Sequence, residues 1–234
     1  MDGQPGPLCD VAYQLQFSRD GKRWVYEAYK EDKCFVVVDG QPEPIHDGIF
    51  GPTFSPDSKH LAYWALDNKN ASAVIDGKSQ GVYSGLAFLP LTFSPDSQHI
   101  AYTAGNGKKS FVVLDGQPGP EFDVTFLPVF SPDSHRLAYW TQKDGKQLVV
   151  VDGKVGSEYD EVDKRFIFFS DDSKHWAYWA RRGNKWLAVL DGREGPQYDR
   201  LIKAKPVFQA DGTIDYLAIK DGMLYRVTHS PSPR

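Results

Sequence analysis

Three histidines recur at one position of a repeated motif, directly after its SPDS turn. They are His60, His99 and His175, and Arg23 and Arg136 take the same position in two other copies. A histidine triad suggests zinc, whose ligands must all lie about 2 Å from one ion. Equivalent positions in a repeat protein are separated in space by at least the width of one repeat, which is too far for three side chains to bind one ion. We therefore expect exposed turn residues here and predict neither a metal nor a cofactor.

Aspartates recur as regularly as the histidines. Two sets stand in turn motifs, where a carboxylate bonds to nearby backbone groups. They are the SPDS set (Asp57, Asp96, Asp133, Asp172) and the Asp-Gly set (Asp39, Asp76, Asp115, Asp152, Asp191). A third set follows each unit's last strand: Asp10, Asp47, Asp123, Asp160 and Asp199, with Ser84 in the remaining place. We expect it to bond to backbone donors, although an acidic ring that attracts a cation or a basic partner is the alternative.

These residues sit on a repeat of short strands. The Phe that opens each motif stands at 17, 54, 93, 130, 169 and 208, and such a period indicates a solenoid or propeller. In one copy, FLPVFS (126–131), RLAYWT (136–141), QLVVV (147–151) and KVGSEYD (154–160) predict four strands. Asp152-Gly153 suits a tight hairpin. LAYW is apolar on both faces, which indicates a strand covered on both sides.

The strand count predicts an all-β, six-bladed β-propeller of four-stranded blades. We expect one domain over 1–234, with units starting near 2, 39, 76, 115, 152 and 191. The last unit lacks a fourth strand, and DGQPGPLCDV (2–11) resembles a spare one. We therefore predict that the N-terminal strand pairs into the last blade and closes the ring, leaving no unpaired edge there.

The motif copies FSPDSKHLAY, FSPDSQHIAY and FSPDSHRLAY resemble the FSPDG-K-LAY core of the TolB-type WD40-like (PD40) repeat propellers, and FSRDGKRWVY retains the Gly. The resemblance covers essentially the whole chain. It implies a propeller used mainly as a binding platform, in bacteria often exported, so it favours an exported, periplasmic parent protein. It implies no reaction, and the chain lacks the GxSxG pattern of hydrolases.

Composition and residue spacing argue against several classes of ligand and partner. A net charge of −4 with no clustered basic face argues against nucleic acid. No apolar run approaches the roughly 18 residues of a membrane helix, so we expect no membrane insertion. Cys9 and Cys34 lack metal-ligand spacing and should be ordinary strand residues. Trp64, Trp140 and Trp179 share one strand position, which favours packing over stacking on sugars.

The repeats differ most where the innermost strands begin, at the predicted channel mouth. The side chains there are Tyr13, Phe50, Phe88, Phe126, Lys164, Arg165, Phe166, Lys203 and Lys205. An aromatic side facing a basic side would suit an anionic or aromatic-bearing ligand, whereas the bland alternative is that the basic residues keep the channel hydrated.

We expect a monomeric, non-catalytic scaffold that binds a protein or peptide through its loop face and channel mouth, because short loops leave little room for catalytic groups. The alternative is a ligand-binding protein or enzyme that uses the channel for an acidic saccharide or another anionic small molecule. A third possibility is a fragment of a longer repeat protein, suggested by the start in mid-repeat.

Overall fold

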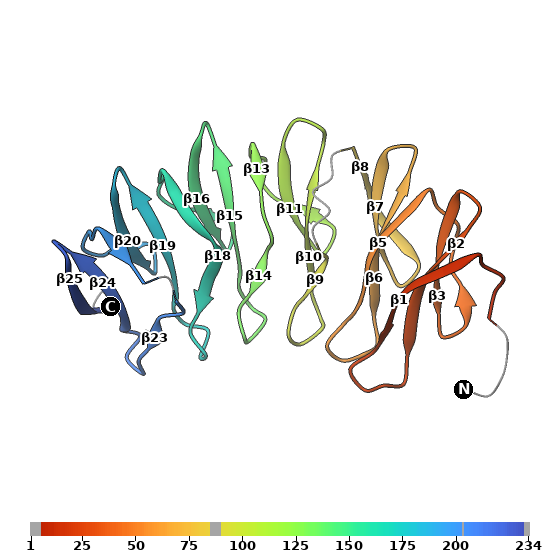
Figure 1. The fold of residues 1–234 in the computed structure, drawn as a ribbon, viewed down its shortest axis with the longest axis horizontal. Coiled ribbons are helices and arrows are strands. Elements are labelled where there is room, and N and C mark those ends of the chain that lie inside the picture. The colour runs from red at the N-terminus through yellow and green to blue at the C-terminus, as the bar shows by residue number, and fades with distance from the viewer. Residues whose placement is uncertain (1–5, 85–89, 203, 232–234) are drawn as a thin grey trace. The chain divides into compact units, whose positions relative to one another are not determined.

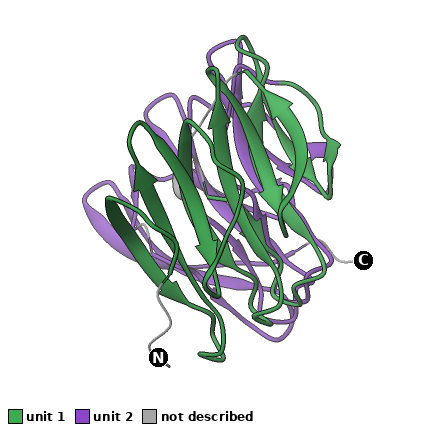
Figure 2. Cartoon of the chain, turned by 90° about the vertical axis from the view of Figure 1, so that its right-hand side faces the viewer, with its two compact units in different colours: residues 1–121 green, residues 122–234 purple. Residues whose placement is uncertain are grey.

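The computed structural model describes residues 6–84, 90–202 and 204–231, except the side chains of residues 164–166. In these residues the chain forms 25 strands and no helix (Figure 1). The all-β prediction is therefore confirmed for the described part of the chain. No segment there is a helix that could cross a membrane. The chain divides into two compact units, residues 1–121 and 122–234, shown in different colours in Figure 2.

The first unit contains three antiparallel sheets of four strands each. Their strand orders are β1-β2-β3-β4, β5-β6-β7-β8 and β12-β11-β10-β9. The strands are β1 (Val11–Phe17), β2 (Trp24–Lys30), β3 (Lys33–Val38), β4 (Gln41–Pro42), β5 (Gly48–Phe54), β6 (Leu61–Asp67), β7 (Asn70–Ile75), β8 (Lys78–Tyr83), β9 (Thr92–Phe93), β10 (Ile100–Gly105), β11 (Ser110–Leu114) and β12 (Gln117–Pro118).

The second unit contains three further antiparallel sheets, in two of which the first strand is formed by two short pieces. The pieces pair with one central strand, β13 and β14 with β15, and β22 and β23 with β24. The strands are β13 (Val124–Thr125), β14 (Val129–Phe130), β15 (Leu137–Lys143), β16 (Lys146–Val151), β17 (Lys154–Val155), β18 (Glu161–Phe169), β19 (Trp176–Arg182), β20 (Lys185–Leu190), β21 (Arg193–Glu194), β22 (Arg200–Leu201), β23 (Val207–Phe208), β24 (Ile214–Lys220) and β25 (Met223–His229).

The four strands predicted from one repeat are found at the expected places. The second and third strands, β15 and β16, run as predicted, whereas β17 covers only two residues of the predicted KVGSEYD strand. An isolated bridge between Gln147 and Tyr159 continues its pairing farther along. The fourth strand is short because residues 154–158 are exposed and gain little from burial.

The Asp-Gly turns have the conformation that their residues favour. Asp152 and Gly153 have φ of 51° and 75°, and the other four pairs have the same signs. Positive φ at both central residues characterises the two-residue hairpin that matches strand twist. In the SPDS turns the last Ser also takes positive φ, 68° at Ser58, and Gly21 takes that place in the first repeat.

Each unit has its core between neighbouring sheets. In the first unit, Val25 and Val36 pack with Leu61 and Tyr63 across the first two sheets. Ala62 and Trp64, on the opposite face of β6, pack with the third sheet. The second unit repeats this arrangement in two clusters around Trp140 and Trp179. The prediction that the LAYW strands are buried on both faces is thus confirmed for β6 and β15, and the equivalent β10 and β19 are buried alike, whereas Leu217 in β24 is 40% exposed.

Ring closure is not confirmed. Residues 2–5 of the predicted closing strand lie outside the described residues, and residues 6–10 belong to no strand. In the described part of the chain β25 pairs only with β24. Cys9 instead packs against the cluster of Ala28, Phe35 and Val37 in the first sheet. The six-bladed ring and the single domain over 1–234 stay predictions.

Candidate functional site

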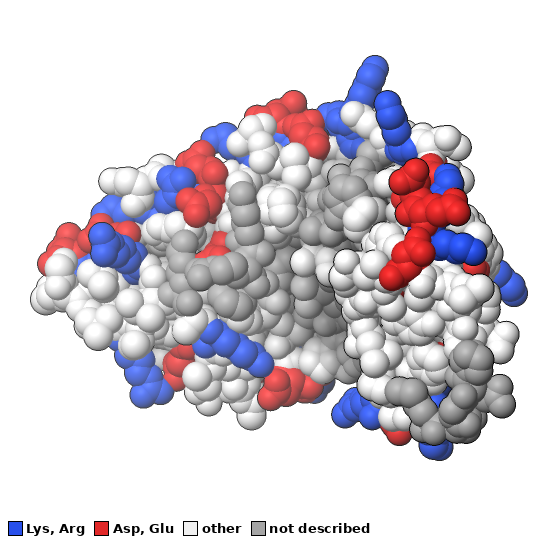
Figure 3. Space-filling model, turned by 45° about the vertical axis from the view of Figure 1, so that its right-hand side comes forward, with Lys and Arg blue, Asp and Glu red and all other residues white. Residues whose placement is uncertain are grey.

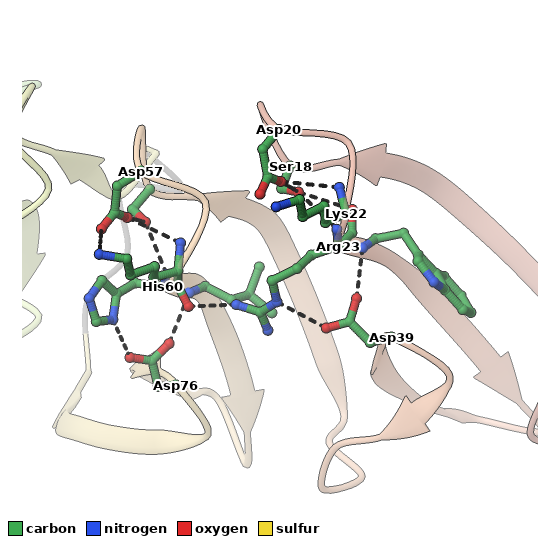
Figure 4. Close-up of polar contacts among 12 residues, drawn as sticks. Ser18, Asp20, Lys22, Arg23, Asp39, Asp57, His60 and Asp76 are labelled. Atoms are coloured by element: carbon green, nitrogen blue, oxygen red, sulfur yellow. Dashed lines mark hydrogen bonds and ion pairs between the residues drawn. The ribbon is translucent and has the colours of Figure 1, made fainter.

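The recurrent histidines pair with the recurrent Asp-Gly aspartates. The Nδ1 atom of His60 lies 2.7 Å from Asp76 Oδ2, and His99–Asp115 and His175–Asp191 repeat the contact at 2.7 and 2.6 Å. Where arginine takes the position, Arg23 Nε donates to Asp39 at 2.9 Å (Figure 4). These side chains therefore tie two turns of one sheet together, in keeping with the turn role predicted for them.

Within each SPDS turn, the serine and aspartate side chains bond to each other and to the backbone. Ser55 Oγ donates to Asp57 Oδ1 at 2.6 Å and accepts the His60 backbone N–H at 3.0 Å. The Ser55 hydroxyl and then the Lys59 backbone N–H lower the pKa of Asp57 to about 2. Such a carboxylate stays ionised at neutral pH and is unsuited to proton transfer there.

The same turns join neighbouring sheets. The Asp57 backbone N–H donates to Ser97 Oγ of the next repeat at 3.0 Å, and Asp20 and Ser58 repeat this bond at 3.2 Å. Arg23 also donates through Nη1 to the carbonyl of Lys59. In the first unit this edge of the sheets is therefore used for hydrogen bonds that join neighbouring sheets.

The third set of aspartates bonds to backbone donors, as expected. Asp10 accepts from the Glu31 backbone N–H at 2.8 Å and Asp47 accepts from that of Asn68 at 2.8 Å. Lysines neutralise several of them: Lys33 pairs with Asp47, Lys146 with Asp160 and Lys185 with Asp199. Their hydrogen bonds lower the pKa values of these three carboxyls. Among the described residues, no group of three or more His, Cys, Asp or Glu side chains is arranged to hold a metal ion.

The repeated tryptophans form part of the core. Trp64, Trp140 and Trp179 are exposed by 2%, 3% and 0%. Rings this deeply buried have no free face for a sugar, so the packing interpretation of these three residues is confirmed.

The residues predicted for the channel mouth are found in both units. Tyr13 and Phe50 lie in β1 and β5, and Phe126 stacks on Trp140 with 4.0 Å between ring centroids. Lys205 is exposed and lies 3.6 Å from Asp171, which is itself almost fully exposed. Phe88 and Lys203 lie outside the described residues, and for Lys164, Arg165 and Phe166 only the backbone, in β18, is described. The predicted site stays a prediction.

Exposed apolar side chains are most numerous on β1 and on the paired strands β24 and β25. In β1, Val11, Tyr13, Leu15 and Phe17 are 43%, 57%, 55% and 62% exposed. We call these four residues the β1 surface. Val124, Val129 and Val207 repeat this exposure on first strands of the second unit. The sequence analysis named Tyr13 alone, because alternation within a strand does not tell which neighbour covers it.

β1 is also the edge of its sheet. It ends the order β1-β2-β3-β4, and among the described strands it pairs only with β2. The register shifts between Tyr13 and Gln16, and Gln14 has φ of 55°. An edge strand offers backbone donors and acceptors, so β1 combines hydrogen-bonding capacity with apolar side chains.

Charge does not mark a site of one sign on the face viewed in Figure 3. Lys and Arg atoms lie beside Asp and Glu atoms on that face. Among the described residues many charged side chains form ion pairs, such as Arg182–Glu194 at 2.7 Å. Side chains paired in this way contribute little to a long-range field. The β1 surface is therefore the stronger candidate for recognition.

Comparisons with known proteins do not assign a family. No protein-family model and no curated protein matches the chain. Similar solved structures include TolB from Acinetobacter baumannii, 19% identical with a TM-score of 0.43 over 79% of this chain. This chain spans 53% of that TolB chain.

Two other similar structures cover nearly the whole chain. The β-propeller domain of the Trilobed protease from Pyrococcus furiosus is 13% identical, with a TM-score of 0.44 over 94% of this chain and 79% of its own. Hydrazine synthase from Kuenenia stuttgartiensis is 12% identical, with a TM-score of 0.40 over 97% and 69%. Similarity at these values does not carry the function of any of these proteins over to this chain.

Proposed function

We propose that the chain is a non-catalytic binding protein that takes up an extended segment of a partner protein along β1. The observation that carries this proposal is the β1 surface. Four apolar side chains, each more than two fifths exposed, stand on a strand that ends its sheet. Isolated exposed apolar residues are ordinary, but several on one element mark an interaction surface.

Strand addition is the mode of recognition that such an edge favours. A peptide that pairs with an exposed sheet edge gains main-chain hydrogen bonds, and its alternate side chains contact the neighbouring surface. The bulge after Tyr13 limits regular pairing to short stretches of β1. We therefore expect a short peptide segment as ligand, with apolar residues at alternate positions.

We also propose that β1 belongs to the first blade of the six-bladed ring predicted from the sequence. The hexapeptide DGQPGP occurs at 2–7 and at 115–120. At 115–120 it includes β12, in which Gln117 pairs with Leu114 of β11. The backbone N–H groups of Asp10 and Asp123 also donate alike, to the backbone carbonyls of Tyr29 and Gln142 at 2.8 and 2.9 Å. These equivalences support a fourth strand at residues 4–5 that pairs with β25.

A designed disulfide tests this closure. The register of the third sheet pairs Ala101 with Leu114, and that of the last sheet pairs Asp215 with Thr228. Because Gln117 pairs with Leu114, Gln4 should pair with Thr228. The double variant Gln4→Cys with Thr228→Cys should form an intramolecular disulfide, and Gln4→Cys with Leu224→Cys should not. Equal yields in both variants would remove the support for closure by this strand.

Selection of random peptides displayed on phage tests the binding function. Enriched peptides should alternate apolar residues, and calorimetry with synthetic copies should show binding to the wild type. The double variant Leu15→Lys with Phe17→Lys should weaken binding at least tenfold, since it places two charges on the β1 surface. The matched control is Val82→Lys, a change at a residue that is 68% exposed on β8 of the same unit.

Two results would overturn the proposal. One is the absence of any enriched peptide, and the other is peptide binding that the β1 variant does not affect. If an acidic saccharide binds instead and Lys205→Ala abolishes that binding, the channel interpretation of the sequence replaces the peptide interpretation. Lys205 is suited to this test because its charged side chain is exposed.

A further inference from the structure

At one position of the central strand, the first sheet has a charged residue where the other sheets have an uncharged one. The position is defined by the Phe that opens the repeated motif. In the second sheet, Phe54 pairs with Leu61 of the central strand, and the position is the third residue after Leu61, Trp64. The residues at this position are Glu27, Trp64, Thr103, Trp140, Trp179 and Leu217. Glu27 is thus a carboxylic acid at a place that other sheets fill with large apolar side chains or threonine.

Glu27 is buried and incompletely hydrogen-bonded. It is 3% exposed, and Tyr29 donates its hydroxyl to Oε2 at 3.4 Å. The other carboxyl oxygen, Oε1, is buried without a hydrogen-bond partner among the described residues. Burial raises the pKa of Glu27, against the effect of the Tyr29 hydroxyl. A buried polar atom without a partner is costly, so this oxygen is a place where a ligand could supply the missing donor.

Two tyrosine rings connect this carboxyl to the β1 surface. Tyr13 pairs with Glu27 across β1 and β2, so both side chains project from the same face of the sheet. The ring of Tyr13 meets the ring of Tyr29 edge to face, with centroids 5.6 Å apart. Tyr13 is also 57% exposed on an edge strand, so it is the side chain that can move to admit a group from solvent.

We propose that Glu27, Tyr13 and Tyr29 bind an ammonium or guanidinium group, the Lys or Arg side chain of the peptide taken up along β1. This inference rests on the proposed function and gives it a specificity. A carboxylate forms charge-assisted hydrogen bonds with such a cation, and tyrosine faces attract it as well. Among the described residues neither oxygen of Glu27 has a charged donor, so a ligand can provide one.

The competing explanation is that Glu27 is a packing residue that tolerates burial in its neutral form. The two explanations differ in what they expect of ligands. A packing residue would not distinguish a cationic ligand from an uncharged one of similar shape, whereas the proposed site would prefer the cation. Matched ligand pairs therefore decide between them.

The experiment compares pairs of probes by calorimetry. One pair is a peptide enriched in the display selection, synthesised with Lys or with norleucine at its central position. The other pair is n-butylammonium and n-butanol. The variants are Glu27→Gln, which keeps the shape of the side chain, and Glu27→Leu, which introduces the residue that Leu217 provides in the last sheet. Circular dichroism and unfolding midpoints confirm that both variants fold.

The wild type should bind the Lys peptide at least tenfold more tightly than the norleucine peptide, and both variants should lose this preference. They should still bind the norleucine peptide, because that binding depends on β1. Equal affinity of the wild type for the two peptides would overturn the cation site and leave the peptide function standing.

If no peptide binds, the proposed function fails and the small probes judge the site. If n-butylammonium then binds the wild type but not Glu27→Gln, and n-butanol binds neither, the result would support a cation site that is independent of peptide uptake. Absence of that difference would overturn the site as well.

Discussion

Replacing His60 by arginine should stabilise the first unit. In the equivalent position, Arg23 pairs with Asp39, reaches the carbonyl of Lys59 in the next sheet, and places its guanidinium 5.2 Å from the centre of the Phe54 ring. Arg136 makes the same three contacts with Asp152, Lys174 and Phe169. Of these three contacts, the His60 side chain makes the one with the aspartate, Asp76, in the described part of the chain. The substitution should therefore add a bond to the carbonyl of Gln98 and a contact with Phe93.

The size of the gain follows from the exposure of the contacts. The side chains of His60 and Asp76 are 42% and 44% exposed, so their ion pair contributes little in either variant. A cation–π contact at an exposed site contributes about 0.5–1 kcal/mol, and a typical hydrogen bond about 0.5–1.5 kcal/mol. Ordering an arginine side chain costs up to about 2 kcal/mol, less here because the fork is held at both ends. The expected net gain is about 0.5 kcal/mol.

Urea unfolding followed by tryptophan fluorescence measures this difference. Its midpoint should rise for His60→Arg, and Arg23→His should lower it by a similar amount. His60→Lys is the matched control, since lysine carries the charge but lacks the planar fork that binds Asp and a carbonyl together. If His60→Arg is neutral or destabilising, or if His60→Lys gains as much, the argument that this side chain links neighbouring sheets is refuted.

Three other changes have directions that follow from the structure. Glu27→Gln should stabilise the protein relative to the wild type, and the difference should grow as pH rises above the usual glutamate pKa of 4.5. The raised pKa of Glu27 means that folding favours the neutral acid, so the wild type loses stability as this group ionises. Unfolding midpoints from pH 4 to 8 would show the difference. Asp57→Asn should remove stability that is present above pH 3.8 and lost as pH falls towards about 2, so variant and wild type should converge at low pH in an acid titration by circular dichroism. Trp140→Ala should cost about 3–5 kcal/mol, since the ring is 3% exposed and stacked on Phe126, while the half-buried Trp186→Ala should cost less in the same urea assay.

Features set by short-range contacts could be predicted from the sequence. The Asp-Gly turns, the SPDS turns and the strands between them depend on the φ preferences of a few adjacent residues and on side chains two to five residues apart. The pairing of His60 with Asp76 spans 16 residues, yet it recurs in every repeat that has this histidine. Repetition therefore made even this contact foreseeable, although the sequence analysis treated the two residue sets separately.

Features set by what covers a strand could not be predicted in this way. Phe17 and Trp64 are both aromatic residues of the repeated motif, but one is 62% exposed and the other 2%. The difference arises because β6 has a sheet on each side and β1 is the edge of its sheet. Glu27 escaped notice for a related reason, because its equivalence to Trp64 appears only when the registers of β2 and β6 are aligned.

The buried carboxyl of Glu27 and the exposed apolar side chains of β1 lie close together, and this location argues that they serve one function. A buried carboxyl and an exposed apolar edge are each unfavourable for stability, and the other central strands show that this repeat can fold with Trp, Thr or Leu in place of Glu27. Exposed apolar side chains occur on first strands of the second unit too, but the first sheet combines them with a buried carboxyl, and Tyr13 and Glu27 face each other across β1 and β2. Two independent defects would have no reason to be paired in register. A peptide that covers β1 and places a cation beside Glu27 would remove both costs at once, so the pairing favours recognition over chance.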